Sequence, residues 1–121
     1  MSYKVAVTST DGKVVNQHFG RAERFLIFEI EDDKYKFVEF RENNPTCNGH
    51  EHDDSAMENT VGLISDCKAV ITERIGPGAA LAVMEQGVKP IEAPYFIEDA
   101  LKYAAQSIEG KLILRNKYRD E

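Results

Sequence analysis

Apolar residues gather in short blocks along this chain, and the spacing within each block indicates which element it forms. Three blocks in the first third are rich in β-branched and aromatic residues, which predicts strands at 3–9, 24–31 and 35–41. Only a turn at Asp32 and Asp33 separates the second block from the third. Such a short connection predicts that these two strands form an antiparallel hairpin.

The rest of the chain alternates between helical and strand-like periodicity. Ser55 and Glu58 form an S-x-x-E capping box, and apolar residues at helical spacing extend the predicted helix to about Asp66. Later elements are strands at 67–72 and 88–92, and helices at 76–86 and from 97 until Gly110. This order predicts an α/β fold, a three-layer sandwich in which helices cover both faces of a mixed five-stranded sheet. We expect a single domain over 1–114 and a polar tail over 115–121.

The predicted sheet contains a point at which a binding site is expected. Right-handed crossovers place the strand at 67–72 parallel to its neighbour. If that neighbour is the first strand, the sheet has a topological switch point between the two, and ligands usually bind there, at the carboxyl ends of the strands. The loops at 10–20 and 73–78 follow these two strands. We therefore expect the two loops to form one site.

Composition and charge narrow the class of partner. The chain has 21 acidic and 15 basic residues and a net charge of -6, so phosphate backbones and anionic lipid surfaces would repel it. No apolar run approaches the ~20 residues that cross a bilayer, and the first residues lack the apolar core of a signal peptide. We expect a cytoplasmic protein that binds neither nucleic acid nor membrane, with reduced cysteines.

Residues 42–54 contain almost no apolar side chains and predict a long exposed loop. This loop carries Cys47, His50 and His52, and a thiolate with two imidazoles suits iron, zinc or an iron-sulfur cluster. Three donors do not complete a closed tetrahedral site, so a fourth ligand would come from elsewhere or the site would be open. A solvated polar loop with incidental Cys and His residues fits the same pattern.

A second candidate ligand is His18, in the stretch from Asn16 to Gly20. It lies in the loop after the first strand, where its imidazole could bind iron or donate a hydrogen bond to a cluster. Phe19 could anchor this loop and Gly20 would permit a tight turn. A structural histidine that is hydrogen-bonded within the loop is the alternative interpretation.

The third candidate motif is Arg74-Ile75-Gly76-Pro77-Gly78. Glycines at the start of a helix expose backbone N–H groups, and Arg74 adds positive charge, so an anionic group could bind there. A tight strand-to-helix turn needs the same glycines.

Cys67 begins an apolar strand, and we expect it in the core. No Ser-His-Asp or Cys-His pattern indicates nucleophilic catalysis, so we expect no enzyme.

Taken together, these segments resemble a known family. DGKVVNQHFG, CKAVITERIGPGA and EQGVKPIEA, in this order, are similar to the dinitrogenase iron-molybdenum cofactor biosynthesis family (the NifX/NifB-type domain), and the likeness extends from Lys4 to about Ala105. The resemblance implies a ribonuclease-H-like fold and a carrier or accessory role. It also implies binding of an iron-sulfur cluster or iron-molybdenum cofactor precursor, with His18 and cysteines as candidate ligands.

Three function classes follow from these observations. The first is a carrier that binds a cluster through His18 and Cys47, with contributions from His50 or His52. It would work with cofactor-assembly or acceptor proteins, as a monomer or weak homodimer. The second is a mononuclear zinc- or iron-binding, or redox-sensing, module built on the loop from Cys47 to His52. The third, a nuclease, is disfavoured because the first strand lacks the carboxylate that a two-metal site needs.

Overall fold

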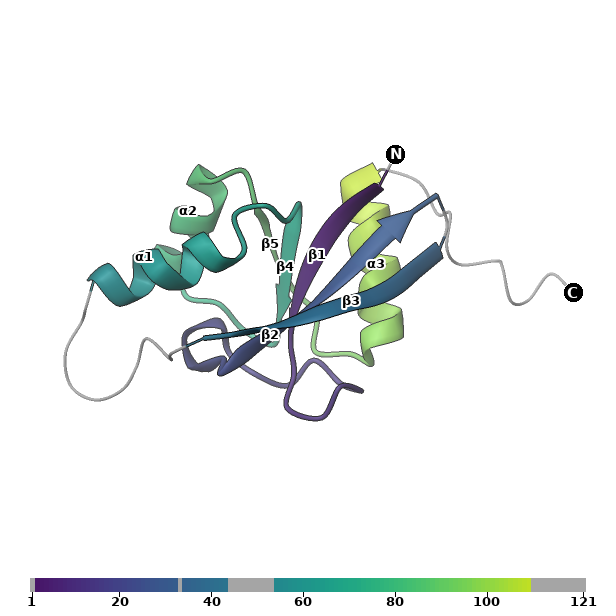
Figure 1. Cartoon of the computed structure of the whole chain (residues 1–121), viewed down its shortest axis with the longest axis horizontal. Helices are drawn as coiled ribbons and strands as arrows, with labels where there is room; N and C mark the ends of the chain where they lie inside the picture. Colours follow the sequence, from purple (N-terminus) through teal and green to yellow (C-terminus); the bar gives the residue numbers. More distant parts are fainter. Residues whose placement is uncertain (1, 33, 44–53, 110–121) are drawn as a thin grey trace, which may run out of the picture.

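The computed structural model describes residues 2–32, 34–43 and 54–109. This part of the chain forms a mixed α/β structure (Figure 1). Its strands are β1 (Ser2–Thr8), β2 (Arg24–Glu31), β3 (Lys34–Glu42), β4 (Ala69–Thr72) and β5 (Lys89–Glu92); its helices are α1 (Asp54–Leu63), α2 (Pro77–Glu85) and α3 (Ile97–Glu109), with a 3₁₀ turn η1 at Phe19–Arg21. The predicted order of strands and helices is confirmed.

The strands form one open sheet in the order β3-β2-β1-β4-β5. The central strand β1 runs antiparallel to β2 and parallel to β4, so Val5 lies between Phe28 on one side and Ala69 on the other. The hairpin of β2 and β3 is antiparallel, whereas β4 and β5 are parallel. The sheet is therefore mixed, and its switch point lies between β1 and β4, as expected. A ribonuclease-H-like relationship stays a prediction.

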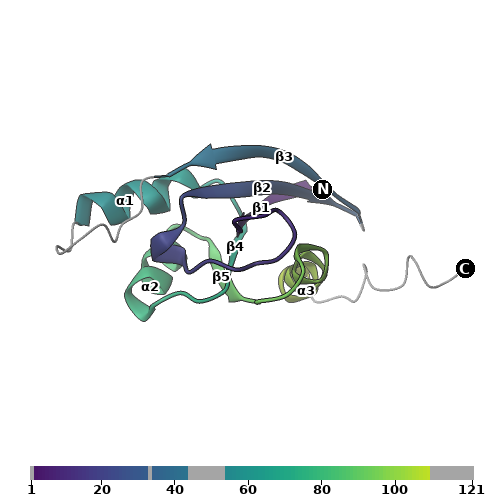
Figure 2. The same ribbon diagram turned by 90° about the horizontal axis from the view of Figure 1, so that it is seen from below.

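Helices cover both faces of the sheet (Figure 2). One apolar cluster packs α3 against β1, β2, β4 and β5, and its buried members include Val5, Ile30, Ile71 and Leu101. The cluster on the other face packs α1, α2 and η1 against the sheet, and its buried members include Phe19, Ile27, Ile64 and Val83. Burying each such side chain contributes roughly 1.5–3 kcal/mol before chain entropy is counted. The two clusters hold the carboxyl ends of β1 and β4 in fixed positions.

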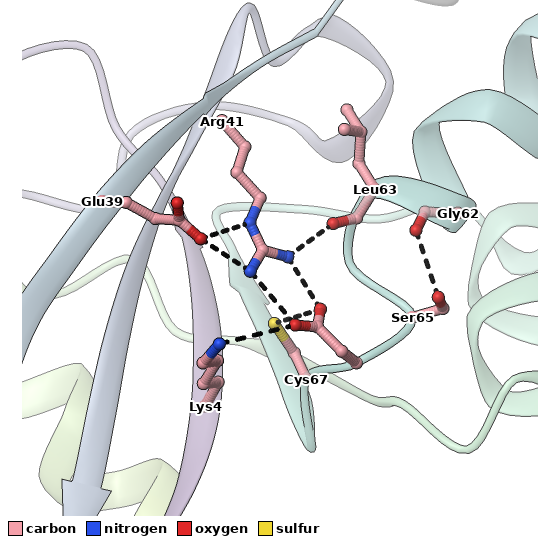
Figure 3. A network of polar contacts seen from close by, with 8 residues as sticks. Lys4, Glu39, Arg41, Gly62, Leu63, Ser65 and Cys67 are labelled. Atoms are coloured by element: carbon pink, nitrogen blue, oxygen red, sulfur yellow. Dashed lines mark hydrogen bonds and ion pairs between the residues drawn. The ribbon is translucent and has the colours of Figure 1, made fainter.

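Helix α1 ends at Leu63, earlier than the apolar spacing predicts. Side chains take up the carbonyls at its end: Ser65 Oγ donates to the Gly62 carbonyl at 3.1 Å, and Arg41 donates to the Leu63 carbonyl at 2.7 Å (Figure 3). These bonds replace the next turn of helix. Cys67 consequently lies in the turn before β4 rather than within the strand, but its side chain is buried, so its predicted core role is confirmed.

Strand β3 contains an irregularity that changes which side chains share a face. The register with β2 shifts between Ile27 and Phe28, so Phe40 pairs with Leu26 and Phe37 pairs with Phe28. Strict alternation would place Phe37 and Phe40 on opposite faces, but the bulge places their rings 4.9 Å apart.

In the described residues, no helix is long and apolar enough to cross a membrane. The predicted domain end at 114 lies outside the described residues.

Candidate functional site

The loop after β1 is a hydrogen-bonded turn rather than an open excursion. Asp11 Oδ1 accepts the backbone N–H groups of Lys13 at 2.9 Å and Val14 at 3.2 Å, and these bonds lower the pKa of the Asp11 carboxyl. Gly12 adopts a left-handed conformation with φ of 76°, which glycine tolerates without strain. Farther along, the side chain of Asn16 bonds both the backbone and the hydroxyl of Thr10. These hydrogen bonds therefore fix the direction in which the chain runs on toward His18.

The segment around His18 lies beside the chain that leaves β4. The Gln17 carbonyl accepts hydrogen bonds from Thr8 Oγ1 and from the Glu73 N–H, each at 2.9 Å. The Phe19 N–H donates to the Arg74 carbonyl at 2.9 Å, so that His18 and Arg74 form a parallel bridge. The two loops predicted to form one site are thus joined by backbone hydrogen bonds.

Phe19 fixes this segment to the core. Its ring is fully buried and packs against Phe25 with ring centroids 5.9 Å apart. His18, the preceding residue, is exposed. An anchored neighbour with an exposed imidazole is an arrangement in which the histidine can bind a ligand without reorganising the fold.

The other side of the 73–75 segment is held by Glu92, the last residue of β5. Glu92 Oε2 accepts the Ile75 N–H at 2.9 Å, and the next residue, Ala93, donates its N–H to the Thr72 carbonyl at 2.9 Å. Residues 73–75 therefore run between the His18 segment and the end of β5.

These three segments enclose a groove of about 430 Å³ at the carboxyl end of the parallel strands. It is lined by His18, Gly20, Arg21, Arg74, Ile75, Gly76, Pro77 and Glu92. Arg21 and Arg74 bring two positive charges and Glu92 brings one negative charge. The groove also lies at the start of α2, where Gly76 is the N-cap and the helix dipole adds positive potential. These groups suit an anionic ligand that contains a metal able to bind an imidazole nitrogen.

The structure brings together four of the predicted site residues: His18, Gly20, Arg74 and Gly76 line the groove. Three others do not line it: Asn16 bonds Thr10, Phe19 belongs to the core, and Gly78 lies in the first turn of α2. The loop candidates Cys47, His50 and His52 lie outside the described residues.

Sequence reasoning missed two groove residues, Arg21 and Glu92. Arg21 directly follows the NQHFG stretch, so its proximity to His18 could have been inferred. Glu92 lies opposite Thr72 in the register of β4 and β5, and that register is not evident in the sequence.

His18 is the imidazole that the described residues bring to the groove. Across 2–32, 34–43 and 54–109, no three His, Cys, Asp or Glu side chains gather into a group that could hold a metal ion. A metal bound through His18 therefore needs ligands from other sources, either from the cargo itself or from residues beyond those ranges.

The two elements that flank residues 44–53 are tied to the turn that follows His18. Asn43 Nδ2 donates to the Ala22 carbonyl at 2.8 Å, and the Asn43 N–H donates to the Glu23 carbonyl at 2.9 Å. Thr60 Oγ1, on α1, donates to Asn43 Oδ1 at 3.1 Å. One asparagine thus connects β3, α1 and the residues just after η1.

The fold and the groove define a small α/β domain with a site at the sheet's switch point that contains two arginine side chains. Residues 1–107 match the family described as dinitrogenase iron-molybdenum cofactor, and the chain belongs to this family. The resemblance carried by NQHFG and RIGPGA is confirmed.

Individual relatives agree with this assignment. The chain is 36% identical over 112 residues to the FeMo cofactor biosynthesis protein NifB of Frankia alni, a match covering 90% of this chain and 21% of NifB. It is 27% identical over 104 residues to Protein NifX of Sinorhizobium fredii, covering 81% of this chain and 65% of NifX. The chain therefore spans about a fifth of the length of the NifB relatives that it matches. The crystal structure of PH0822 shares the fold, with a TM-score of 0.63 and 28% identity over 89% of this chain and 92% of that one.

Proposed function

We propose that this protein is a carrier that binds an iron-sulfur cluster or an iron-molybdenum cofactor precursor, and that it is not itself an enzyme. The observation that supports this most directly is the parallel bridge between His18 and Arg74, which places an exposed histidine next to an arginine in the lining of the groove. In this proposal the cluster is cargo. The protein holds it and releases it to a cofactor-assembly or acceptor protein.

The chemistry of the groove suits such a cargo. An imidazole nitrogen is a good ligand for iron, and sulfides of a cluster accept hydrogen bonds from N–H donors. Arg21 and Arg74 would stabilise the negative charge that cluster sulfides carry. Because the groove is open and His18 is exposed, an acceptor protein could approach the bound cluster directly.

We further propose that Cys47, with His50 or His52, supplies the remaining ligands. The support is indirect and comes from Asn43, which ties the residues flanking 44–53 to the turn after His18. A thiolate from this segment would add the soft ligand that iron-sulfur clusters require. Cytoplasmic location, a monomer or weak homodimer and a ribonuclease-H-like ancestry belong to the same proposal.

Anaerobic reconstitution with iron and sulfide tests the carrier role. We expect the wild-type protein to bind both, and His18→Ala and Cys47→Ala to bind much less. Cys67→Ala is the matched control, because it removes a buried thiol that precedes β4, at the opposite end of that strand from the groove, and should leave iron and sulfide content unchanged.

Two results would contradict the proposal. Unchanged iron and sulfide in both His18→Ala and Cys47→Ala would exclude the proposed ligands. One zinc or iron per chain without acid-labile sulfide would instead indicate a mononuclear metal-binding or redox-sensing module.

A further inference from the structure

The Glu92 carboxylate accepts a hydrogen bond from the Ile75 N–H, and both residues line the groove. Without Glu92, this N–H would be available to the proposed cargo. We propose that the Glu92 carboxylate is an internal competitor for the cluster: it holds the Ile75 N–H when the groove is empty and is displaced when an anionic cluster binds. The inference rests on the proposed function and adds a residue that sets how tightly the cargo is held.

The geometry of the 73–75 segment supports this role. On the side facing His18, its bonds are made with backbone partners, the Gln17 carbonyl and the Phe19 N–H. On the side facing β5, the Ile75 N–H donates at 2.9 Å to a side chain, Glu92 Oε2. A backbone partner is fixed by the fold, but a carboxylate can leave by rotation of its own side chain.

Because of its position, Glu92 can give up its hydrogen bond with the Ile75 N–H at little cost in free energy. Glu92 is exposed, so its carboxylate regains water when it leaves the Ile75 N–H. Both partners of the bond line the groove, together with Arg21 and Arg74. The departing carboxylate frees one N–H for a cluster sulfide and removes a like charge from beside the anionic cargo.

The competition predicts the effect of removing the charge. Hydrogen bonds to charged acceptors are stronger than those to neutral ones, so a glutamine amide at position 92 would hold the Ile75 N–H less tightly. We expect Glu92→Gln to retain the reconstituted cluster about fivefold longer than wild type, a change that corresponds to about 1 kcal/mol. Glu92→Ala, which leaves no competing acceptor, should retain it at least as long.

The experiment measures the half-time of cluster loss to an excess of an iron chelator, under anaerobic conditions. Glu85→Gln, at the far end of α2, is the matched control because it changes the net charge equally without touching the groove. Amide NMR spectra of the cluster-free proteins provide a second readout: the Ile75 amide signal should shift in Glu92→Gln and stay in place in Glu85→Gln.

The outcomes separate this inference from the carrier proposal. Longer retention in Glu92→Gln, with Glu85→Gln equal to wild type, supports the competition. Equal or shorter retention in both position-92 variants, while His18→Ala still abolishes loading, overturns the competition and leaves the carrier role intact. Failure of the wild-type protein to load any cluster overturns both.

Discussion

Arg41 and Asp66 form a two-pronged ion pair that joins β3 to the turn between α1 and β4 (Figure 3). Arg41 Nη1 lies 2.7 Å from Asp66 Oδ1, and Nη2 lies 3.1 Å from Oδ2. Glu39 accepts a further bond from Arg41, and Lys4 approaches Asp66 at 3.8 Å. Together these contacts connect β1, β3, the turn before β4 and the end of α1.

Asp66→Asn should destabilise the protein in a pH-dependent way. Hydrogen bonds from Arg41 lower the pKa of the Asp66 carboxyl below its ordinary value of 3.8. The pair is thus fully stabilising above that ordinary pKa, and the stabilisation is lost as the pH falls through the lower, folded-state value. Because the Asp66 side chain is half exposed, we expect a loss of only about 1 kcal/mol at pH 7.

Urea unfolding at pH 7 and at pH 3 measures this effect. The difference between wild type and Asp66→Asn should be smaller at pH 3. Glu98→Gln, which removes a pair between exposed Glu98 and partly buried Lys102 within α3, is the control and should change little at either pH. A constant difference between wild type and Asp66→Asn at both pH values would contradict the assigned role of the carboxylate.

The Cys67 thiol should resist modification in the folded protein. Burial, reinforced by the neighbouring negative charge of Asp66, raises the pKa of Cys67 to about 12, and the side chain is only 4% exposed. In a Cys47→Ser variant, where Cys67 alone can react, we expect negligible reaction with a thiol reagent at pH 8 and full reaction in denaturant. Rapid reaction of the native protein would show that the turn before β4 opens readily.

Two buried threonines on the same face of the sheet should respond oppositely to the same substitution. Thr8 Oγ1 donates to the Gln17 carbonyl at 2.9 Å, whereas Thr72 Oγ1 has no hydrogen-bond partner among the described residues. We expect Thr8→Val to lower the free energy of unfolding by about 1 kcal/mol, and Thr72→Val to raise it by about as much. Thermal or urea unfolding distinguishes the two, and equal losses would refute the difference in bonding.

A pair of glycine substitutions separates backbone strain from helix propensity. Gly87 follows α2 with φ of 83°, and a Cβ there would meet no neighbour, so Gly87→Ala should cost about 1–2 kcal/mol through backbone strain alone. Gly62 lies within α1 with equally open space around it. Gly62→Ala should therefore stabilise by about 0.5–1 kcal/mol. Urea unfolding of both variants checks the signs.

Local patterns in the sequence were sufficient to predict the strands and the hairpin, and the switch point followed on the assumption that the first strand pairs with the strand at 67–72. The apolar blocks have the period of the element that each forms, and the short turn at Asp32 leaves the hairpin little choice of geometry. Placement of His18 and Arg74 in one site followed from topology, because both lie in loops after neighbouring strands.

Features that depend on contacts between distant residues were not predictable. The end of α1 is set partly by Arg41, which lies 22 positions away from Leu63. Likewise, Glu92 reaches the groove only because β5 pairs with β4 in one register. Such contacts form between surfaces that exist only after folding, so they cannot be predicted from the spacing of apolar residues or from composition.

The groove and the apolar core draw on almost separate sets of residues. Among the described residues that line the groove, Ile75 alone also packs against an apolar cluster. Substitutions at the other groove positions should therefore change the surface of the groove more than the packing of the core. In this architecture the lining of the groove can therefore vary one residue at a time while the apolar core stays intact.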